Sequence, residues 1–222
     1  FTLREGLKWS DGSDFFASDF VKSWNRAADP ELGADYGYLF DVIARLDDGT
    51  LNVVADDEAR TLVVTLTSPC AYFLELCGFT TFYPVKVELA DAEGAWATDP
   101  AKYIGTGPFR MTEFKVDDVA SFEKNPYYWN AENVSLETVN LSILSDSTTI
   151  YNGFESYELD YCSTSEAEWI DKFMSYSDVV YQITPSATLA YSFYNTKDAI
   201  FSNANIRKAF TLAMDREELN DM

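Results

Sequence analysis

Histidine is absent from this 222-residue sequence. It is the commonest general base, the usual partner of a serine nucleophile and the commonest metal ligand. Carboxylate-only chemistry would have to use acidic pairs, but the densest acidic clusters, Asp56–Glu58 and Asp117–Asp118, fall in turn-like segments. No nucleophile motif, cofactor loop or metal-ligand set accompanies them. We therefore predict a protein that is not an enzyme and that uses no metal or other cofactor.

Cysteine is scarce as well, and Cys70, Cys77 and Cys162 are the only three. With an odd number, not all of them can pair within the chain. In a helix, the separation of Cys70 and Cys77 would be about 10 Å at 1.5 Å per residue, whereas a disulfide needs Cα atoms within about 7 Å. Their spacing does not match a zinc motif either. We expect buried thiols, since a disulfide here would require a broken helix.

Long apolar runs are missing, and none approaches the roughly 20 residues that span a bilayer. Basic residues are few, with 16 Lys and Arg against 37 Asp and Glu, for a net charge of −21. Such a charge repels phosphate backbones and anionic lipid, which argues against nucleic acid and membrane surfaces as partners. The acidity favours solubility, and the alternative is attraction of cationic ligands.

Hydrophobic residues, by contrast, make up 47% of the chain and include 16 Phe, 14 Tyr and 5 Trp. This content is enough for one large domain or two small ones. The sequence opens at Phe1 in a strand-like segment, without an initiator methionine or signal peptide, and stops inside a helix-like one. We expect the natural N-terminus to lie outside these residues.

Local periodicity indicates a mixed α/β chain with both hairpins and helix crossovers. Trp24 and Phe210 lie on apolar faces of amphipathic segments, so both are predicted core anchors. Ser18 is the predicted N-cap of the first helix. A hairpin is predicted over residues 108–124. Further strands are predicted over residues 1–5, 61–67, 139–143, 159–161, 179–184 and 189–194, and helices over 18–28, 36–45, 69–76, 147–156, 166–173 and 206–214.

Several short motifs occur in a recognisable order along the whole chain. Each is weak alone, but in this order and spacing they resemble the oligopeptide- and dipeptide-binding proteins of bacterial ABC importers, solute-binding protein family 5. Most of these motifs have structural explanations as turns, strand starts and helix starts, so they identify the family without locating a binding site. They are Phe1–Gly12, Ala17–Trp24, Gly105–Phe109, Glu123–Trp129, Tyr194–Lys197, Ile206–Phe210 and Ala213–Glu217.

One position departs from the family pattern. Tyr157 stands where the family usually has glycine, so a positive-φ turn there would be strained by its side chain. Members of the family are also more than twice this long. The resemblance therefore implies a fragment that lacks the N-terminus and most of a second lobe.

The resemblance implies a periplasmic-binding-protein-like lobe of the cluster C type, with a mixed sheet and flanking helices. Residues 1–88 would form a small α/β subdomain of the first lobe, and residues 89–186 its main mixed-sheet domain. Residues 187–222 would cross the hinge and begin the truncated second lobe. Ligands of such two-lobed proteins are extended peptides held mainly through their backbone.

The resemblance also implies ligand-binding positions, each of which has a structural alternative. Tyr36 would face the ligand or pack as an ordinary helix residue. Ser163 and Thr164 would supply polar contacts or form a helix N-cap. Tyr191 and Phe193 lie on the same face of the predicted strand, because side chains alternate along a strand. They would either line the ligand groove or pack in the core. Asn195 is the sixth candidate, for which a structural role in the Tyr-Asn-Thr turn is the stronger alternative.

The implied function is the extracytoplasmic substrate-binding component of an ABC importer. It would capture oligopeptides and deliver them to the permease subunits. Its only attachment to the membrane would be a lipid anchor in the missing N-terminus. The alternatives are a binding protein for an oligosaccharide or a nickel complex, or the ligand-sensing component of a receptor. The missing histidines disfavour nickel, whereas the many tyrosines and tryptophans suit sugar stacking as well as peptide binding.

Overall fold

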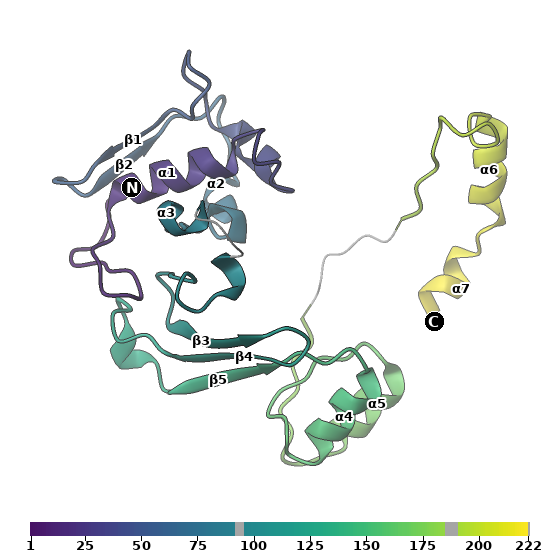
Figure 1. Ribbon diagram of the computed structural model, residues 1–222. Coiled ribbons are helices and arrows are strands. Elements are labelled where there is room, and N and C mark those ends of the chain that lie inside the picture. The colour runs from purple at the N-terminus through teal and green to yellow at the C-terminus, as the bar shows by residue number, and fades with distance from the viewer. Residues whose placement is uncertain (92–95, 185–190, 222) are drawn as a thin grey trace. The chain divides into compact units, whose positions relative to one another are not determined.

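The computed structural model describes residues 1–91, 96–184 and 191–221, which form two compact units, Phe1–Cys162 and Ser163–Met222 (Figure 1). The first unit combines two small sheets with short helices, and the second contributes helices. The predicted mixed α/β class is confirmed. The predicted subdomain limits at residues 88 and 186 stay a prediction.

The first unit has a hydrophobic core beside helix α1, Ala17–Ala27, which lies against the antiparallel strands β1, Val53–Asp56, and β2, Thr61–Val64. Trp24 is 2% exposed and donates its indole N–H to the carbonyl oxygen of Phe82 at 2.8 Å. This bond satisfies the polar atom of a large buried ring, so Trp24 is the core anchor that the sequence predicted. The cluster also contains Ala28, Phe40, Ile43, Leu51, Val53, Leu62 and Phe73.

Short helices complete this region. Cys70 and Cys77 flank the short helix Phe73–Leu76. Both are free thiols that are half-buried against the core, in agreement with the prediction that they do not form a disulfide. The α-helices are α2, Phe73–Leu76, and α3, Val87–Ala90; the 3₁₀ helices are η1, Gly37–Val42, η2, Thr80–Phe82, η3, Trp96–Thr98, and η4, Ala131–Asn133.

The second sheet has the order β3–β4–β5, with strands Phe109–Lys115, Val119–Lys124 and Thr138–Ser142. The first two form the predicted hairpin, with a bulge after Met111. All strand pairs in the described ranges are antiparallel, whereas the sequence predicted a mixed sheet. Parallel pairing needs a long crossover between strands, and β3, β4 and β5 instead follow one another as sequence neighbours.

Three of the family motifs meet at one partly buried junction, which we call the motif junction and define as Ser10, Gly105, Gly107, Asn125 and Tyr127. The backbone N–H of Ser10 donates to the oxygen of Gly105 at 2.8 Å, and the N–H of Gly105 returns a bond to Ser10 Oγ at 3.2 Å. The side chain of Asn125 donates to the oxygen of Gly107 at 2.8 Å and accepts from the N–H of Tyr127 at 2.9 Å. Ser10 and Asn125 are buried, and their bonds connect the N-terminal segment to the β3–β5 sheet.

The turn beside this junction requires glycine. Gly12 has φ +87°, a conformation that side chains disfavour, and a Cβ there would lie 2.9 Å from Cζ of Tyr127. The Ser-Asp-Gly turn therefore rests directly on the tyrosine ring of the Asn-Pro-Tyr-Tyr-Trp motif.

Helix α1 begins differently from the prediction. Ser18 lies inside the helix and is not its N-cap. Asp57, from the β1–β2 turn, accepts hydrogen bonds from the backbone N–H of Ser18 at 2.8 Å and from its hydroxyl at 2.7 Å. A carboxylate at a helix N-terminus satisfies an orphan donor and complements the helix dipole. Asp57 is thus a structural cap supplied by tertiary contact.

Several predicted strands are absent from the described residues. Residues 1–5 contribute a single bridge, between Thr2 and Thr61, and residues 159–161, 179–184 and 191–194 form no strand. Residues 189 and 190 lie outside the described ranges. An extended segment becomes a strand only by pairing its backbone groups over several residues. Residues 1–3 pair only briefly with residues 60–62, and the other segments have no ladder partner among the described residues.

Helix α4, Ser147–Glu155, is confirmed, and Asp146 caps it by accepting from the N–H of Thr149. Tyr157 follows with φ +62° and a largely exposed side chain. Tyr157 therefore adopts the strained positive-φ conformation, although the sequence had put a turn of this kind in doubt.

The second unit contains α5, Ala167–Met174, α6, Ala204–Ala213, and α7, Arg216–Asp221. Phe210 of α6 was predicted to be a core anchor, but it is 54% exposed. Its ring contacts those of Phe201 at 5.5 Å and Tyr194 at 6.4 Å. The amphipathic pattern correctly predicts the helix, but no further layer of described residues in this unit covers its apolar face.

The motif junction predicts a large effect of Asn125→Ala. The substitution leaves the oxygen of Gly107 and the N–H of Tyr127 without their partner, which should lower the free energy of unfolding by about 2–4 kcal/mol. Asn133→Ala is the matched control, because that side chain is exposed and bonds only to Asn130. Urea denaturation of both variants measures the difference, and equal losses would contradict a special role for the junction.

The ion pair between Asp11 and Lys86 predicts a pH dependence. Burial raises the pKa of Asp11, but hydrogen bonds from Lys86 and Ser13 outweigh burial and lower the pKa to about 2, below its ordinary value of 3.8. A carboxyl group with a depressed pKa stabilises the fold above pH 3.8, and this contribution is lost as the pH falls towards 2.

Asp11→Asn should therefore lower the urea midpoint at neutral pH, and the gap to the wild type should close between about pH 4 and pH 2. Lys86→Met should show the same convergence, because it removes the other partner. If the difference in urea midpoint between the variants and the wild type does not change with pH, the Asp11–Lys86 ion pair does not contribute to stability.

Tyr157→Gly should raise stability by about 1 kcal/mol, because glycine adopts positive φ without the steric cost paid by a side chain. Tyr157→Ala is the control, since it removes the ring but keeps the Cβ that causes the strain. Thermal and urea denaturation should rank glycine above both tyrosine and alanine. If alanine stabilises as much as glycine, the ring and not the backbone is responsible.

Candidate functional site

Tyr36 belongs to an exposed aromatic cluster with Tyr38 and Phe79, called the Tyr36 cluster below. It immediately precedes η1, and its ring meets that of Phe79 edge-on with centroids 5.0 Å apart. Tyr38 lies 6.3 Å away on its other side, and Tyr36 is 48% exposed. Neighbouring rings thus hold the tyrosine in place while half of its surface stays open, an arrangement that suits ligand contact better than burial.

Ser163 and Thr164 precede helix α5 in the second unit. Thr164 Oγ1 accepts from the N–H of Glu166 at 3.0 Å, which stabilises a turn before α5; the N-cap is Glu166, so the predicted capping by Thr164 is wrong. Ser163 is exposed, and its hydroxyl has no hydrogen bond to any residue in the described ranges. Of the two, Ser163 has the side chain that is free to contact a solute.

Tyr191 and Phe193 are 66% and 84% exposed. Their rings pack edge to face with centroids 4.8 Å apart, which places them side by side as the alternation predicted. Both are exposed in this structure, so core packing does not account for them. Asn195 has a structural role, because its side chain accepts from the N–H of Lys197 at 3.1 Å and stabilises a turn.

The six predicted positions are divided between the two units. Tyr36 lies in the first unit, and Ser163, Thr164, Tyr191, Phe193 and Asn195 lie in the second. Sequence reasoning did not include Tyr38 and Phe79, the neighbours of Tyr36. The alternating Tyr36–Tyr38 spacing was a visible signal for the first, whereas Phe79 is brought there only by the fold.

The electrostatics of the described residues favour binding over chemistry. Burial raises the pKa of the Cys77 and Cys162 thiols, so neither is poised as a thiolate nucleophile. Two of the clustered acidic residues have structural contacts: Asp57 caps α1, and Asp56 accepts from the N–H of Ala59 at 2.8 Å. Within residues 1–91, 96–184 and 191–221, no group of three potential ligands from His, Cys, Asp and Glu could hold a metal ion. No helix in those ranges is both long and apolar enough to cross a membrane.

Residues 1–222 match the profile of the bacterial extracellular solute-binding proteins, family 5 Middle. The chain belongs to this family of binding proteins, as its motifs suggested. It is 35% identical over 229 residues to the dipeptide-binding protein DppE of Bacillus subtilis, covering 99% of this chain and 41% of DppE.

Solved structures confirm the periplasmic-binding-protein-like fold. A periplasmic oligopeptide-binding protein from Borrelia burgdorferi superimposes with a TM-score of 0.83 at 26% identity, covering 100% of this chain and 46% of the other. The Listeria monocytogenes OppA bound to peptide gives a TM-score of 0.78 at 30% identity, covering 100% and 45%. The chain spans about two fifths of the length of the curated relatives it matches.

Proposed function

We propose that this chain is part of the extracytoplasmic binding component of an ABC importer, which captures oligopeptides and delivers them to the permease. The observation that carries the proposal is the family match over all 222 residues, supported by the likeness to a peptide-bound OppA. In the full-length protein, a lipid anchor would hold this component at the outer face of the cell membrane.

The exposed side chains suit an extended peptide. The Tyr36 cluster and the Tyr191–Phe193 pair offer ring faces and edges, which bind apolar side chains without demanding one sequence. Ser163 offers an unengaged hydroxyl for the peptide backbone, whose hydrogen bonds give affinity independently of side-chain identity. We place residues 1–88 and 89–186 in a first lobe and residues 187–222 at the hinge and the start of a second.

The net charge of −21 is compatible with this ligand class. A negative field attracts the amino terminus of a peptide and repels its carboxylate, so it favours peptides with basic side chains, and the effect weakens as salt screens the charges. The same field disfavours nucleic acid and anionic lipid headgroups.

Isothermal titration of the full-length protein with trialanine, tetraalanine and pentaalanine tests the proposal. At least one peptide should bind, and Tyr36→Ala should weaken that binding by about 3- to 10-fold, since an aromatic contact contributes about 0.5–1.5 kcal/mol. Ser163→Ala should weaken it by a similar factor through the loss of one hydrogen bond.

Tyr181→Ala is the matched control, because Tyr181 is 55% exposed and is not a candidate. It should leave peptide affinity unchanged. Absence of binding to every peptide, together with a thermal shift on adding an oligosaccharide, would replace the peptide by a sugar. Equal losses for Tyr36→Ala and Tyr181→Ala would show that the Tyr36 cluster does not contact the ligand.

A further inference from the structure

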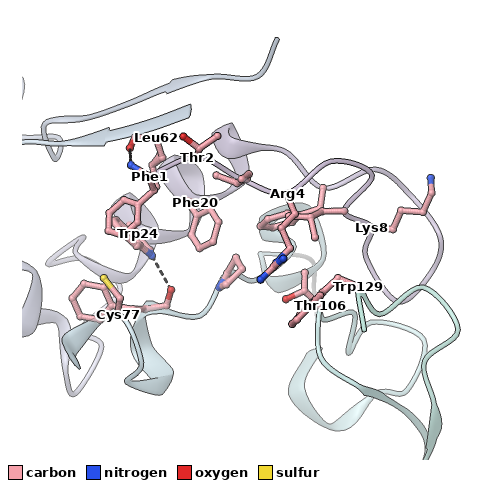
Figure 2. A pocket seen from close by; sticks show the side chains of 15 residues that line it. Phe1, Thr2, Arg4, Lys8, Phe20, Trp24, Leu62, Cys77, Thr106 and Trp129 are labelled. Carbon is pink, nitrogen blue, oxygen red and sulfur yellow. Dashed lines mark hydrogen bonds between the residues drawn. The ribbon is translucent and has the colours of Figure 1, made fainter. Parts of the chain in front are cut away.

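The first unit contains a cavity of about 430 Å³ that none of the six candidate residues lines. Most of its wall is apolar, and Figure 2 shows these side chains gathered at one end. The volume lies in the range of pockets that hold small molecules. The apolar wall includes Phe1, Phe20, Trp24, Leu62, Cys77 and Phe82.

The other end of the cavity is polar. Arg4, Thr106 and Trp129 lie there, and the guanidinium carbon of Arg4 stands 4.0 Å from the centroid of the Trp129 ring (Figure 2). Stacking on the ring orients the planar guanidinium while leaving its N–H groups available.

Arg4 has no carboxylate partner among residues 1–91, 96–184 and 191–221, although acidic residues outnumber basic ones 37 to 16. Lys8, which also lines the cavity, is already engaged: its ammonium bonds to Asp14 at 2.8 Å and to the oxygen of Gly12 at 3.3 Å. Arg4 is therefore the cation that remains available to a ligand at this end.

We propose that this cavity binds a small amphipathic carboxylate, such as a medium-chain fatty acid. The carboxylate pairs with Arg4, and the alkyl tail lies along the wall of Phe1, Phe20 and Leu62. Arginine presents paired N–H donors that match the two oxygens of a carboxylate. The site is separate from the proposed peptide site and does not depend on it.

Other ligand chemistries fit this cavity less well. A cationic amphiphile would place its charge against Arg4. A neutral alcohol of the same length would keep the apolar contacts but lose the charge-assisted hydrogen bonds. A peptide backbone would bury N–H and C=O groups against an apolar wall without partners.

Cys77 gives a direct readout, because it lines the cavity whereas Cys70 and Cys162 do not. All three thiols are free, so alkylation at each can be followed by mass spectrometry. Dodecanoate at about ten times its Kd should slow alkylation of Cys77 about tenfold, by leaving about a tenth of the sites empty. Cys70 and Cys162 should react at unchanged rates. Dodecyltrimethylammonium should protect none of them.

Arg4→Gln should weaken dodecanoate binding at least about tenfold, while binding of dodecanol stays unchanged. Lys8→Gln is the matched control and should bind dodecanoate almost as the wild type does, because Lys8 is paired with Asp14. Arg4 is exposed and lacks hydrogen bonds to the described residues, so its replacement should not disturb folding.

Isothermal titration with the same three amphiphiles gives a second measurement on the full chain. Absence of dodecanoate binding in both assays, equal binding of the cationic amphiphile, or full binding by Arg4→Gln would each overturn the proposal. Trialanine affinity, measured with and without dodecanoate, should not change. Dodecanoate binding tests the cavity proposal, and trialanine affinity tests the peptide proposal, so either proposal can fail without the other.

Discussion

The side chain of Asn125 is the constraint on which the arrangement of the first unit depends. It is fully buried; its amide nitrogen donates to the Gly107 oxygen while its amide oxygen accepts from the Tyr127 N–H. Leaving either group unsatisfied in a buried position would cost more than a typical hydrogen bond contributes. With the Ser10–Gly105 pair, it joins the N-terminal turn to the β3–β5 sheet. The family motifs that meet here therefore have a structural role, because their hydrogen bonds stabilise the fold.

The aromatic residues divide into two groups by exposure. Trp24 is buried with its N–H satisfied by Phe82, and it contributes to the core. Tyr36, Tyr191 and Phe193 remain open, although each is oriented by a neighbouring ring. Open rings held in fixed orientations lose little entropy when a ligand arrives, so they suit recognition. The peptide-binding proposal rests on this second group.

The excess of acidic residues has a local explanation as well as a global one. Asp57, Asp146 and Asp215 each accept backbone N–H groups at a helix start, and Asp11 pairs with Lys86. Carboxylates at these places satisfy donors that the helices leave open. Arg4, stacked on Trp129, is the feature that gives the apolar cavity a charged end.

Sequence by itself determined the features that depend on a few neighbouring residues. The helices predicted over residues 18–28, 147–156 and 206–214 and the hairpin predicted over residues 108–124 correspond to α1, α4, α6 and the β3–β4 pair. The positive φ of Tyr157 was not predicted, because a tyrosine in that conformation is strained. Tertiary structure decided the rest. The Asp57 cap of α1, the stacking of Arg4 on Trp129 and the exposure of Phe210 all depend on which distant segments lie nearby. Local patterns specify which face of an element is apolar, whereas burial and pairing require a partner surface that only the folded chain supplies.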